Sequence, residues 1–112
     1  MKLLVDANFL IDYYARRDGF FDSCTTLLVA ESFRDVELWA PAKSFTDVFY
    51  VLNQRLKVES PLVQRAFLKS FDFIKLVSLE PADVKEAARR AWDDFEDCLV
   101  AVAAEKIGAD FI

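Results

Sequence analysis

The chain has 112 residues, of which 54% are apolar and 29% are charged, a composition typical of one packed globular domain rather than a disordered segment. Histidine is absent, which excludes Ser-His and Cys-His triads, imidazole bases and histidine-rich zinc sites. The net charge of −5 argues against nucleic-acid binding by diffuse basic attraction, although cations bound by clustered acids would cancel part of it. No apolar stretch reaches membrane-spanning length, and Asp6 interrupts the first one. We therefore expect neither a membrane anchor nor a signal peptide, and we expect the protein to be cytoplasmic.

The first third of the chain predicts alternating strands and helices. Residues 2–5 are a short apolar run that indicates a strand buried on both faces, and Asp6 follows it directly. Apolar residues then recur at helical spacing from Phe9 to a basic end closed by Gly19, which predicts a first helix. A second helix is predicted over residues 22–33 and a short strand over residues 36–40.

The middle of the chain predicts two helices. The run from Phe45 to Leu56 is too long for a strand and is apolar nearly all round, which predicts a buried helix. Asp47 lies inside that apolar surface. Ser60 and Pro61 begin the next helix, which ends before Lys75.

The last third predicts a strand over residues 75–79, a helix from Pro81 to about Trp92, and a final helix over residues 95–107 closed by Gly108. Residues 109–112 resemble the first half of one more strand, so we expect the natural domain to continue. The alternation of strands and helices predicts one α/β domain over residues 1–112 with a mainly parallel sheet.

Asp6 is the acid with the fewest structural explanations. A charged residue at the end of a buried strand costs desolvation unless it has a partner, and capping a helix is its only evident structural role. Ligands of open parallel sheets bind beyond the carboxyl ends of the strands, which is where Asp6 lies. Asn8 either caps the first helix or contacts a metal-bound water.

Asp47 has two explanations that the sequence leaves open. It lies three residues after Ser44, a spacing close to that of a capping box at a helix start. Against a cap, Pro41 and Ala42 suggest an earlier start for the helix, and the apolar neighbours imply a burial that an unpaired carboxylate resists. Asp47 is therefore either a cap or a metal ligand.

A run of acids, Asp93-Asp94-Phe95-Glu96-Asp97, begins the last helix. Asp94 suits the N-cap, and acids in a first turn complement the helix dipole. Asp94 and Asp97 are nevertheless like-charged neighbours at helical spacing, and Arg89 and Arg90 could pair with Asp93 and Asp94 but not with Asp97. A solvated acidic turn is one explanation; a divalent cation such as Mg²⁺, held by one or two carboxylates and water, is the other.

Three segments of the chain, which begin at Leu3, Ser44 and Asp94, match segments of one protein family and occur in the same order. Through them the chain resembles the PIN-domain ribonucleases, in particular the toxins of VapBC-type toxin–antitoxin pairs, over essentially its whole length. The segments are Leu3-Leu4-Val5-Asp6-Ala7-Asn8, Ser44-Phe45-Thr46-Asp47-Val48-Phe49-Tyr50-Val51-Leu52, and Asp94-Phe95-Glu96-Asp97-Cys98-Leu99 with Ala103-Ala104 and Gly108-Ala109-Asp110.

The resemblance implies a three-layer α/β/α sandwich and an acidic centre. Asp6, Asp47 and Asp97 would be the catalytic residues, and together with Asp94 they would hold Mg²⁺ or Mn²⁺. Asp97 rather than Glu96 matches the third acid of the family. Asn8 and Ser44 would be auxiliary residues of the same site.

Two departures from the family pattern are visible. The family commonly has glutamate at the position of Asp47, whose side chain is one methylene shorter. Family members also usually continue past Ile112 into a threonine and a fourth acidic position, so the resemblance implies that this sequence lacks the C-terminal segment of the domain.

The resemblance further implies hydrolysis of RNA by a metal-activated water. The candidates for contacts to the RNA backbone are Arg16, Arg17 and Lys43, together with Arg55 and Lys57. Scattered basic residues of this kind are more often part of a solvated surface. The implied partners are a second copy of the chain in a homodimer and a cognate antitoxin that blocks the acidic pocket. The alternative is a PIN-like module that binds RNA or protein without cleaving.

Overall fold

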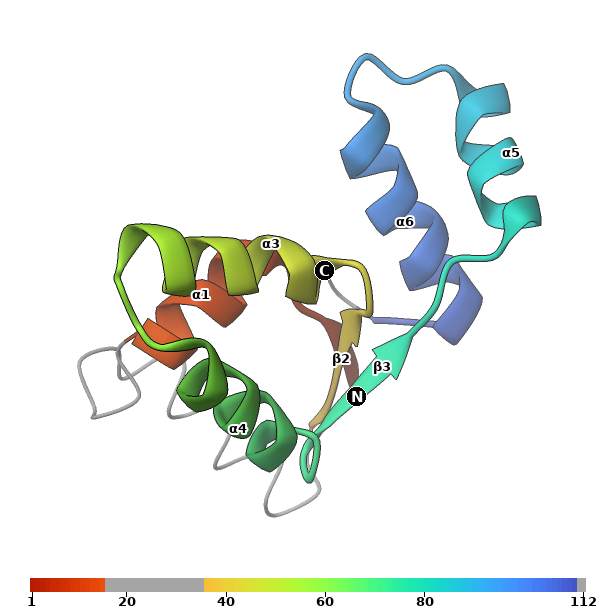
Figure 1. Cartoon of the computed structure of the whole chain (residues 1–112). Coiled ribbons are helices and arrows are strands. Elements are labelled where there is room, and N and C mark those ends of the chain that lie inside the picture. The colour runs from red at the N-terminus through yellow and green to blue at the C-terminus, as the bar shows by residue number, and fades with distance from the viewer. Residues whose placement is uncertain (16–35, 111–112) are drawn as a thin grey trace.

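The computed structural model describes residues 1–15 and 36–110. The helix predicted over residues 22–33, as well as Arg16 and Arg17, lies outside these ranges. Figure 1 shows the arrangement of the elements, which in chain order are β1 (Lys2–Leu4), α1 (Ala7–Ala15), β2 (Glu37–Pro41), α3 (Ser44–Tyr50), the π-helical turn η1 (Val51–Arg55), α4 (Ser60–Ser70), β3 (Ile74–Val77), α5 (Pro81–Arg90) and α6 (Phe95–Ile107).

The three described strands form a parallel sheet in the order β1-β2-β3. Leu4 of β1 pairs with Trp39 of β2, and the Val5 N–H donates to the Trp39 carbonyl at 2.8 Å, which extends the pairing up to Asp6. Because all strands run the same way, their carboxyl ends meet at one edge of the sheet. The predicted α/β fold with a parallel sheet is confirmed.

Alternating side chains of the strands point into two different cores. Leu38 and Ile74 belong to the larger core, to which α1, α3 and α4 contribute Leu10, Val48 and Val63. On the other face, Leu4 and Val77 pack against Ala103 and Ala104 of α6. Helices therefore cover both faces of the sheet, as in the predicted three-layer sandwich, and Figure 1 shows α1, α3 and α4 on one side and α5 with α6 on the other.

The helix predicted from Phe45 to Leu56 differs from the structure. α3 ends at Tyr50 and continues as the wider turn η1, closed by the Leu56 N–H donating to the Val51 carbonyl at 3.0 Å. Lys57 then takes a left-handed conformation with φ of 61°. Tyr50 and Leu56 are exposed, so the prediction of a helix buried all round was wrong: only one side of it faces the larger core.

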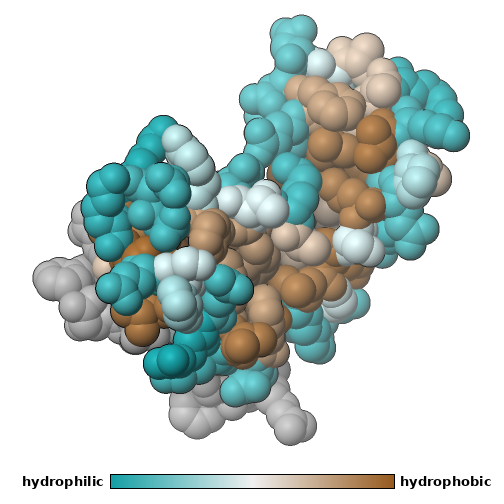
Figure 2. Space-filling view, viewed as in Figure 1, coloured by the Kyte–Doolittle hydropathy of each residue, from teal (hydrophilic) through white to brown (hydrophobic). Residues whose placement is uncertain are grey.

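α5 and α6 form a helical hairpin. α5 ends at Arg90, before the predicted end at Trp92, because Ala91 adopts a left-handed conformation with φ of 54°. α6 ends at Ile107, and the φ of 67° at the C-cap residue Gly108 confirms the predicted glycine cap. Figure 2 shows hydrophobic surface gathered over this hairpin, where Val84 and Phe95 are among the exposed apolar side chains.

After α6 the chain returns to β1. The Asp110 N–H donates to the Lys2 carbonyl at 2.8 Å, and the Lys2 N–H donates to Asp110 Oδ2 at 2.8 Å. The rest of the strand predicted to begin here lies outside the described residues. None of the described helices is both long enough and apolar enough to cross a bilayer.

Candidate active site

A pocket of about 200 Å³ opens where the amino-terminal ends of α1, α3 and α6 meet. Six of its eight lining residues carry side-chain oxygen atoms, and four of these six are acids. The lining residues are Asp6, Ala7, Asn8, Ser44, Asp94, Glu96, Asp97 and Val100. The fold thus brings acids from opposite ends of the chain to the carboxyl edge of the sheet, where ligands of parallel sheets bind.

Asp6 reaches this pocket from the turn between β1 and α1. Its Oδ1 accepts a hydrogen bond of 2.9 Å from the Phe9 N–H, so Asp6 caps the first turn of α1. Asp6 is exposed, so its carboxylate bears little desolvation cost, and the helix cap named from the sequence as its only evident structural role is confirmed. Among the described residues nothing bonds to its second carboxylate oxygen, which is available to a ligand in the pocket.

Asp94 and Asp97 reach the pocket from the start of α6. Asp94 is the N-cap of this helix, and its Oδ1 accepts a hydrogen bond of 3.0 Å from the Asp97 N–H, which confirms the predicted cap. The Asp97 carboxylate forms no hydrogen bond or ion pair with any residue in the described ranges. Arg89 and Arg90 do not relieve the acid run, because α5 ends at Arg90 and both guanidinium groups turn to other partners.

Asp47 lies outside the lining of the pocket. It is exposed in the first turn of α3, so its expected burial was wrong. The capping-box explanation was also wrong, because the N-cap is Lys43 and Ser44 is already the first helical residue. Ser44 lines the pocket, and Asp47 follows it by one turn on the same side of α3.

Glu96 was assigned no role from the sequence, yet it lines the pocket. Its place in the acid run, within the first turn of α6, is the signal that could have found it. Its Oε1 lies 3.5 Å from Lys43 Nζ, which places Lys43 at the rim of the pocket. Arg55 and Lys57 do not line the pocket, because they follow at the far end of η1.

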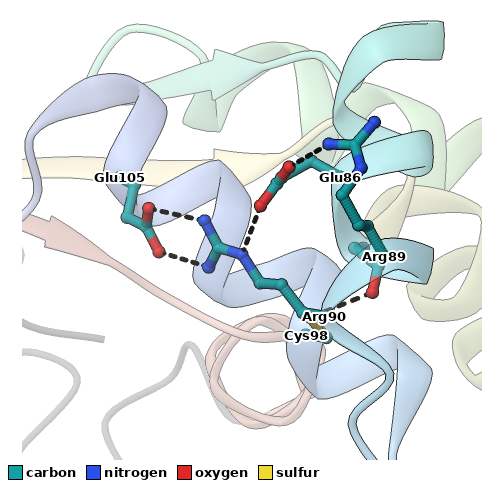
Figure 3. Close-up of polar contacts among 6 residues, drawn as sticks. Glu86, Arg89, Arg90, Cys98 and Glu105 are labelled. Atoms are coloured by element: carbon teal, nitrogen blue, oxygen red, sulfur yellow. Dashed lines mark hydrogen bonds and ion pairs between the residues drawn. The ribbon is translucent and has the colours of Figure 1, made fainter.

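In the hairpin that carries Asp94 and Asp97, an arginine lies between two glutamates (Figure 3). Arg90 Nε donates to Glu86 Oε2 at 2.9 Å, and its two terminal nitrogens donate to the Glu105 carboxylate at 2.6 and 2.9 Å. The hydrogen bonds from Arg90 lower the pKa of both Glu86 and Glu105, and they raise the pKa of Arg90. Arg90 thereby connects α5 with α6.

Beneath these ion pairs the two helices share an apolar contact. Ala87 of α5 packs against Cys98, Leu99 and Val102 of α6, and the free thiol of Cys98 donates to the Ala87 carbonyl at 3.6 Å. Cys98 directly follows Asp97 in the chain. The contact therefore fixes the turn of α6 that carries the pocket acids.

The donor chemistry of the pocket fits a hard cation held partly by water. Carboxylate, amide and hydroxyl oxygens are the ligands that Mg²⁺ and Mn²⁺ prefer, and neither nitrogen ligands nor thiolates line the pocket. No three acidic or cysteine side chains in the described ranges are grouped closely enough to hold a metal ion by themselves. Mg²⁺ usually takes only one or two carboxylates directly and keeps several waters, so the pocket suits that mode and not a closed cage.

Fold and pocket together define a parallel α/β protein with an acid-lined pocket at the carboxyl edge of its sheet. The sequence matches the PIN domain family over residues 2–112, and the chain therefore belongs to that family, whose members are generally nucleases. No curated protein is similar enough to this chain to count as a match.

Proposed function

We propose that this chain is a metal-dependent endoribonuclease and the toxin of a type II toxin–antitoxin pair. The observation that carries the proposal is the meeting of Asp6, Asp94 and Asp97 in one pocket of a PIN domain. In this proposal Asp6 and Asp97 are the catalytic acids and, with Asp94, bind Mg²⁺ or Mn²⁺. Asp47 contributes from the first turn of α3 through water.

Asn8 and Ser44 in the pocket and Lys43 at its rim would position the substrate. A bound divalent cation would supply an activated water and charge stabilisation for attack on the phosphodiester. Asn8 and Ser44 offer an amide and a hydroxyl that orient water or ribose oxygens. Lys43 offers an ammonium group to an RNA phosphate at the rim.

The partners in this proposal follow from the charge of the pocket. An antitoxin that inserts a basic side chain among these acids would neutralise part of their negative charge and exclude the cation. A homodimer is part of the same proposal and rests on the resemblance to VapBC-type toxins alone. The proposed cytoplasmic location rests on the sequence, in which Asp6 interrupts the first apolar run before a signal peptide could form.

The replacement Asp6→Asn tests the enzyme proposal, because asparagine keeps the cap of α1 and removes the charge. We expect Mn²⁺-dependent cleavage of RNA by the natural full-length protein to fall more than ~100-fold, since a group that contacts the metal matters more than its outer-shell partners. The thermal unfolding midpoint should not change. Asp12→Asn, an exposed acid of the same helix outside the pocket, is the matched control and should cleave normally.

Failure of this test would favour the alternative function. A full-length protein that binds RNA equally well with and without metal, and never cleaves it, is a binding module. For the toxin role, induced expression should arrest growth and co-expression of a neighbouring small gene should relieve the arrest. Harmless expression of an active enzyme would indicate a housekeeping nuclease.

A further inference from the structure

Lys43 occupies a position where its own helix gains nothing from its side chain. It is the N-cap of α3, with φ of −62° and ψ of −26°, and its side chain forms no capping hydrogen bond. Helices prefer side chains with an oxygen acceptor at this position, and a cation there faces the positive end of the helix dipole. The charge of Lys43 therefore needs an explanation outside α3.

The Lys43 ammonium reaches across the rim of the pocket to α6. Its Nζ lies 3.5 Å from Oε1 of Glu96, which lines the pocket with Asp6, Asp94 and Asp97. The other basic side chains that form ion pairs in the described ranges have partners elsewhere: Lys75 pairs with Glu37, Arg89 and Arg90 with acids of the hairpin, and Lys106 with Glu80 and Asp83. Within those ranges, Lys43 alone brings a positive charge to an acid of the pocket.

We infer that Lys43 is an internal counter-cation of the acidic pocket, which competes with the divalent cation and lowers the affinity of the RNA-free site for it. This inference rests on the proposed function, because it concerns the same cation site. The ammonium offsets part of the mutual repulsion of the four carboxylates, and it repels an entering cation.

The competition couples metal binding to RNA binding. The Lys43 side chain is a flexible four-carbon stem with its charge at the tip, and the ion pair with Glu96 is partly exposed, with 34% of the lysine and 64% of the glutamate side chain accessible. Such a pair is weak and exchanges partners easily. An RNA phosphate that takes Lys43 away from Glu96 leaves the acids free for the metal, so each ligand raises the affinity for the other.

The test measures Mn²⁺ binding to the RNA-free protein from the electron paramagnetic resonance signal of free Mn²⁺. Lys43→Gln should tighten Mn²⁺ binding about threefold to tenfold, because one repelling charge is lost. Lys43→Arg keeps the charge and should bind Mn²⁺ like the wild type. Thermal unfolding gives a second readout: saturating Mn²⁺ should raise the midpoint more for Lys43→Gln than for the wild type.

Lys75→Gln is the matched control. Lys75 Nζ lies 3.4 Å from Glu37 Oε2, a similar exposed pair, but it lies near the amino ends of β2 and β3, opposite the pocket edge of the sheet. The same loss of charge there should leave Mn²⁺ affinity unchanged. A gain equal to that of Lys43→Gln would mean that net charge alone sets the affinity and would overturn the inference.

The remaining outcomes separate the two proposals. If the wild type binds Mn²⁺, Asp6→Asn weakens that binding and Lys43→Gln leaves it unchanged, the cation site stands and Lys43 is not its counter-cation. If only Lys43→Gln binds measurably, the inference is supported in its strongest form. If neither protein binds Mn²⁺, both the cation site and its counter-cation are overturned.

Discussion

Two acid-rich regions of this molecule satisfy their carboxylates in different ways. At the interface of α5 and α6, Glu86 and Glu105 both bond to Arg90, and the pKa of each carboxyl is lowered by that contact. In the pocket, Asp6 and Asp94 accept hydrogen bonds only from backbone N–H groups of their own helices among the described residues. Within residues 1–15 and 36–110, basic side chains thus pair with the acids that connect helices, and Lys43 alone pairs with an acid that lines the pocket.

α6 belongs to both regions, and this makes the contrast informative. Its first turn carries the pocket acids, while its flank packs against α5 through Cys98 and Leu99. Exposed ion pairs contribute little stability, so the apolar contact holds the hairpin and Arg90 fixes its orientation. Changes in the first turn of α6 should therefore affect catalysis, and changes on its flank should affect folding.

The largest expected effect is that of Asp97→Asn on catalysis. If Asp97 holds the metal, RNA cleavage should fall by more than ~100-fold. The free energy of unfolding should stay within error of the wild type, because this carboxylate forms no hydrogen bond or ion pair with a described residue. Cleavage assays at several Mn²⁺ concentrations and urea unfolding measure the two quantities. Asp93→Asn, in the same acid run but outside the pocket lining, is the control. Equal losses from both replacements would show that general acidity of the run matters rather than the pocket.

Leu99→Ala should lower the free energy of unfolding, the quantity that Asp97→Asn leaves unchanged. Leu99 is 8% exposed and packs between α5 and α6, so its truncation should cost about 2–4 kcal/mol in the free energy of unfolding. Leu68→Ala, at a side chain that is 68% exposed on α4, should change stability by less than about 0.5 kcal/mol. Urea denaturation compares the two. An unaffected Leu99→Ala protein would mean that the hairpin does not depend on its apolar contact.

Asp47→Asn should have an intermediate effect on cleavage. Asp47 lies one turn beyond Ser44 and outside the pocket lining, so a contact with the cation through water predicts a loss of roughly tenfold, the scale of an outer-shell ligand. The measurement is the rate of RNA cleavage beside that of Asp6→Asn. A loss as large as that of Asp6→Asn would make Asp47 a direct ligand, and full activity would remove it from the site.

Local rules explain what the sequence predicted well. The apolar run before Asp6, the cap at Asp94 and the glycine at position 108 are short-range signals, and the structure confirms the strand, the cap and the helix end. The parallel sheet followed from the alternation of strands and helices. That Asp6 and Asp97 face one pocket was an expectation of the family resemblance, and no short-range signal carries it.

The predictions that failed depended on tertiary packing. Asp47 has apolar neighbours in sequence, but the buried members of that group, such as Phe45 and Val48, face the larger core while Asp47 faces solvent. By its spacing in the sequence, Arg90 could pair with the acids that follow it in the chain. The chain instead turns at Ala91, and Arg90 pairs with Glu105 on the neighbouring helix. Helical spacing relates residues within one helix and cannot reveal which helix packs beside it.

The smallest expected effect concerns acid pH at the α5–α6 interface. The pKa values of Glu86 and Glu105 are lowered by their bonds to Arg90, so the folded state holds fewer protons than the unfolded state in this range. The stabilisation is fully present above the ordinary glutamate value of about 4.3, and it is lost as pH falls through the lower folded values. The protection factors of amide hydrogens in α5 and α6, which are corrected for the intrinsic exchange rate at each pH, should therefore fall at acid pH more than those in α4. Arg90→Leu should remove the part of this response that Glu86 and Glu105 supply, and leave the part from Asp83, whose pKa is lowered by the Glu80 backbone and by Lys106. Arg89→Ala should retain most of the response, because Arg90 still bonds to both glutamates and the Arg89 side chain is 70% exposed. If the Arg90→Leu protein keeps the wild-type acid response, the ion pairs of Arg90 do not contribute to the pH dependence of stability. The hairpin and the pocket would then differ in the geometry of their acids and not in stability.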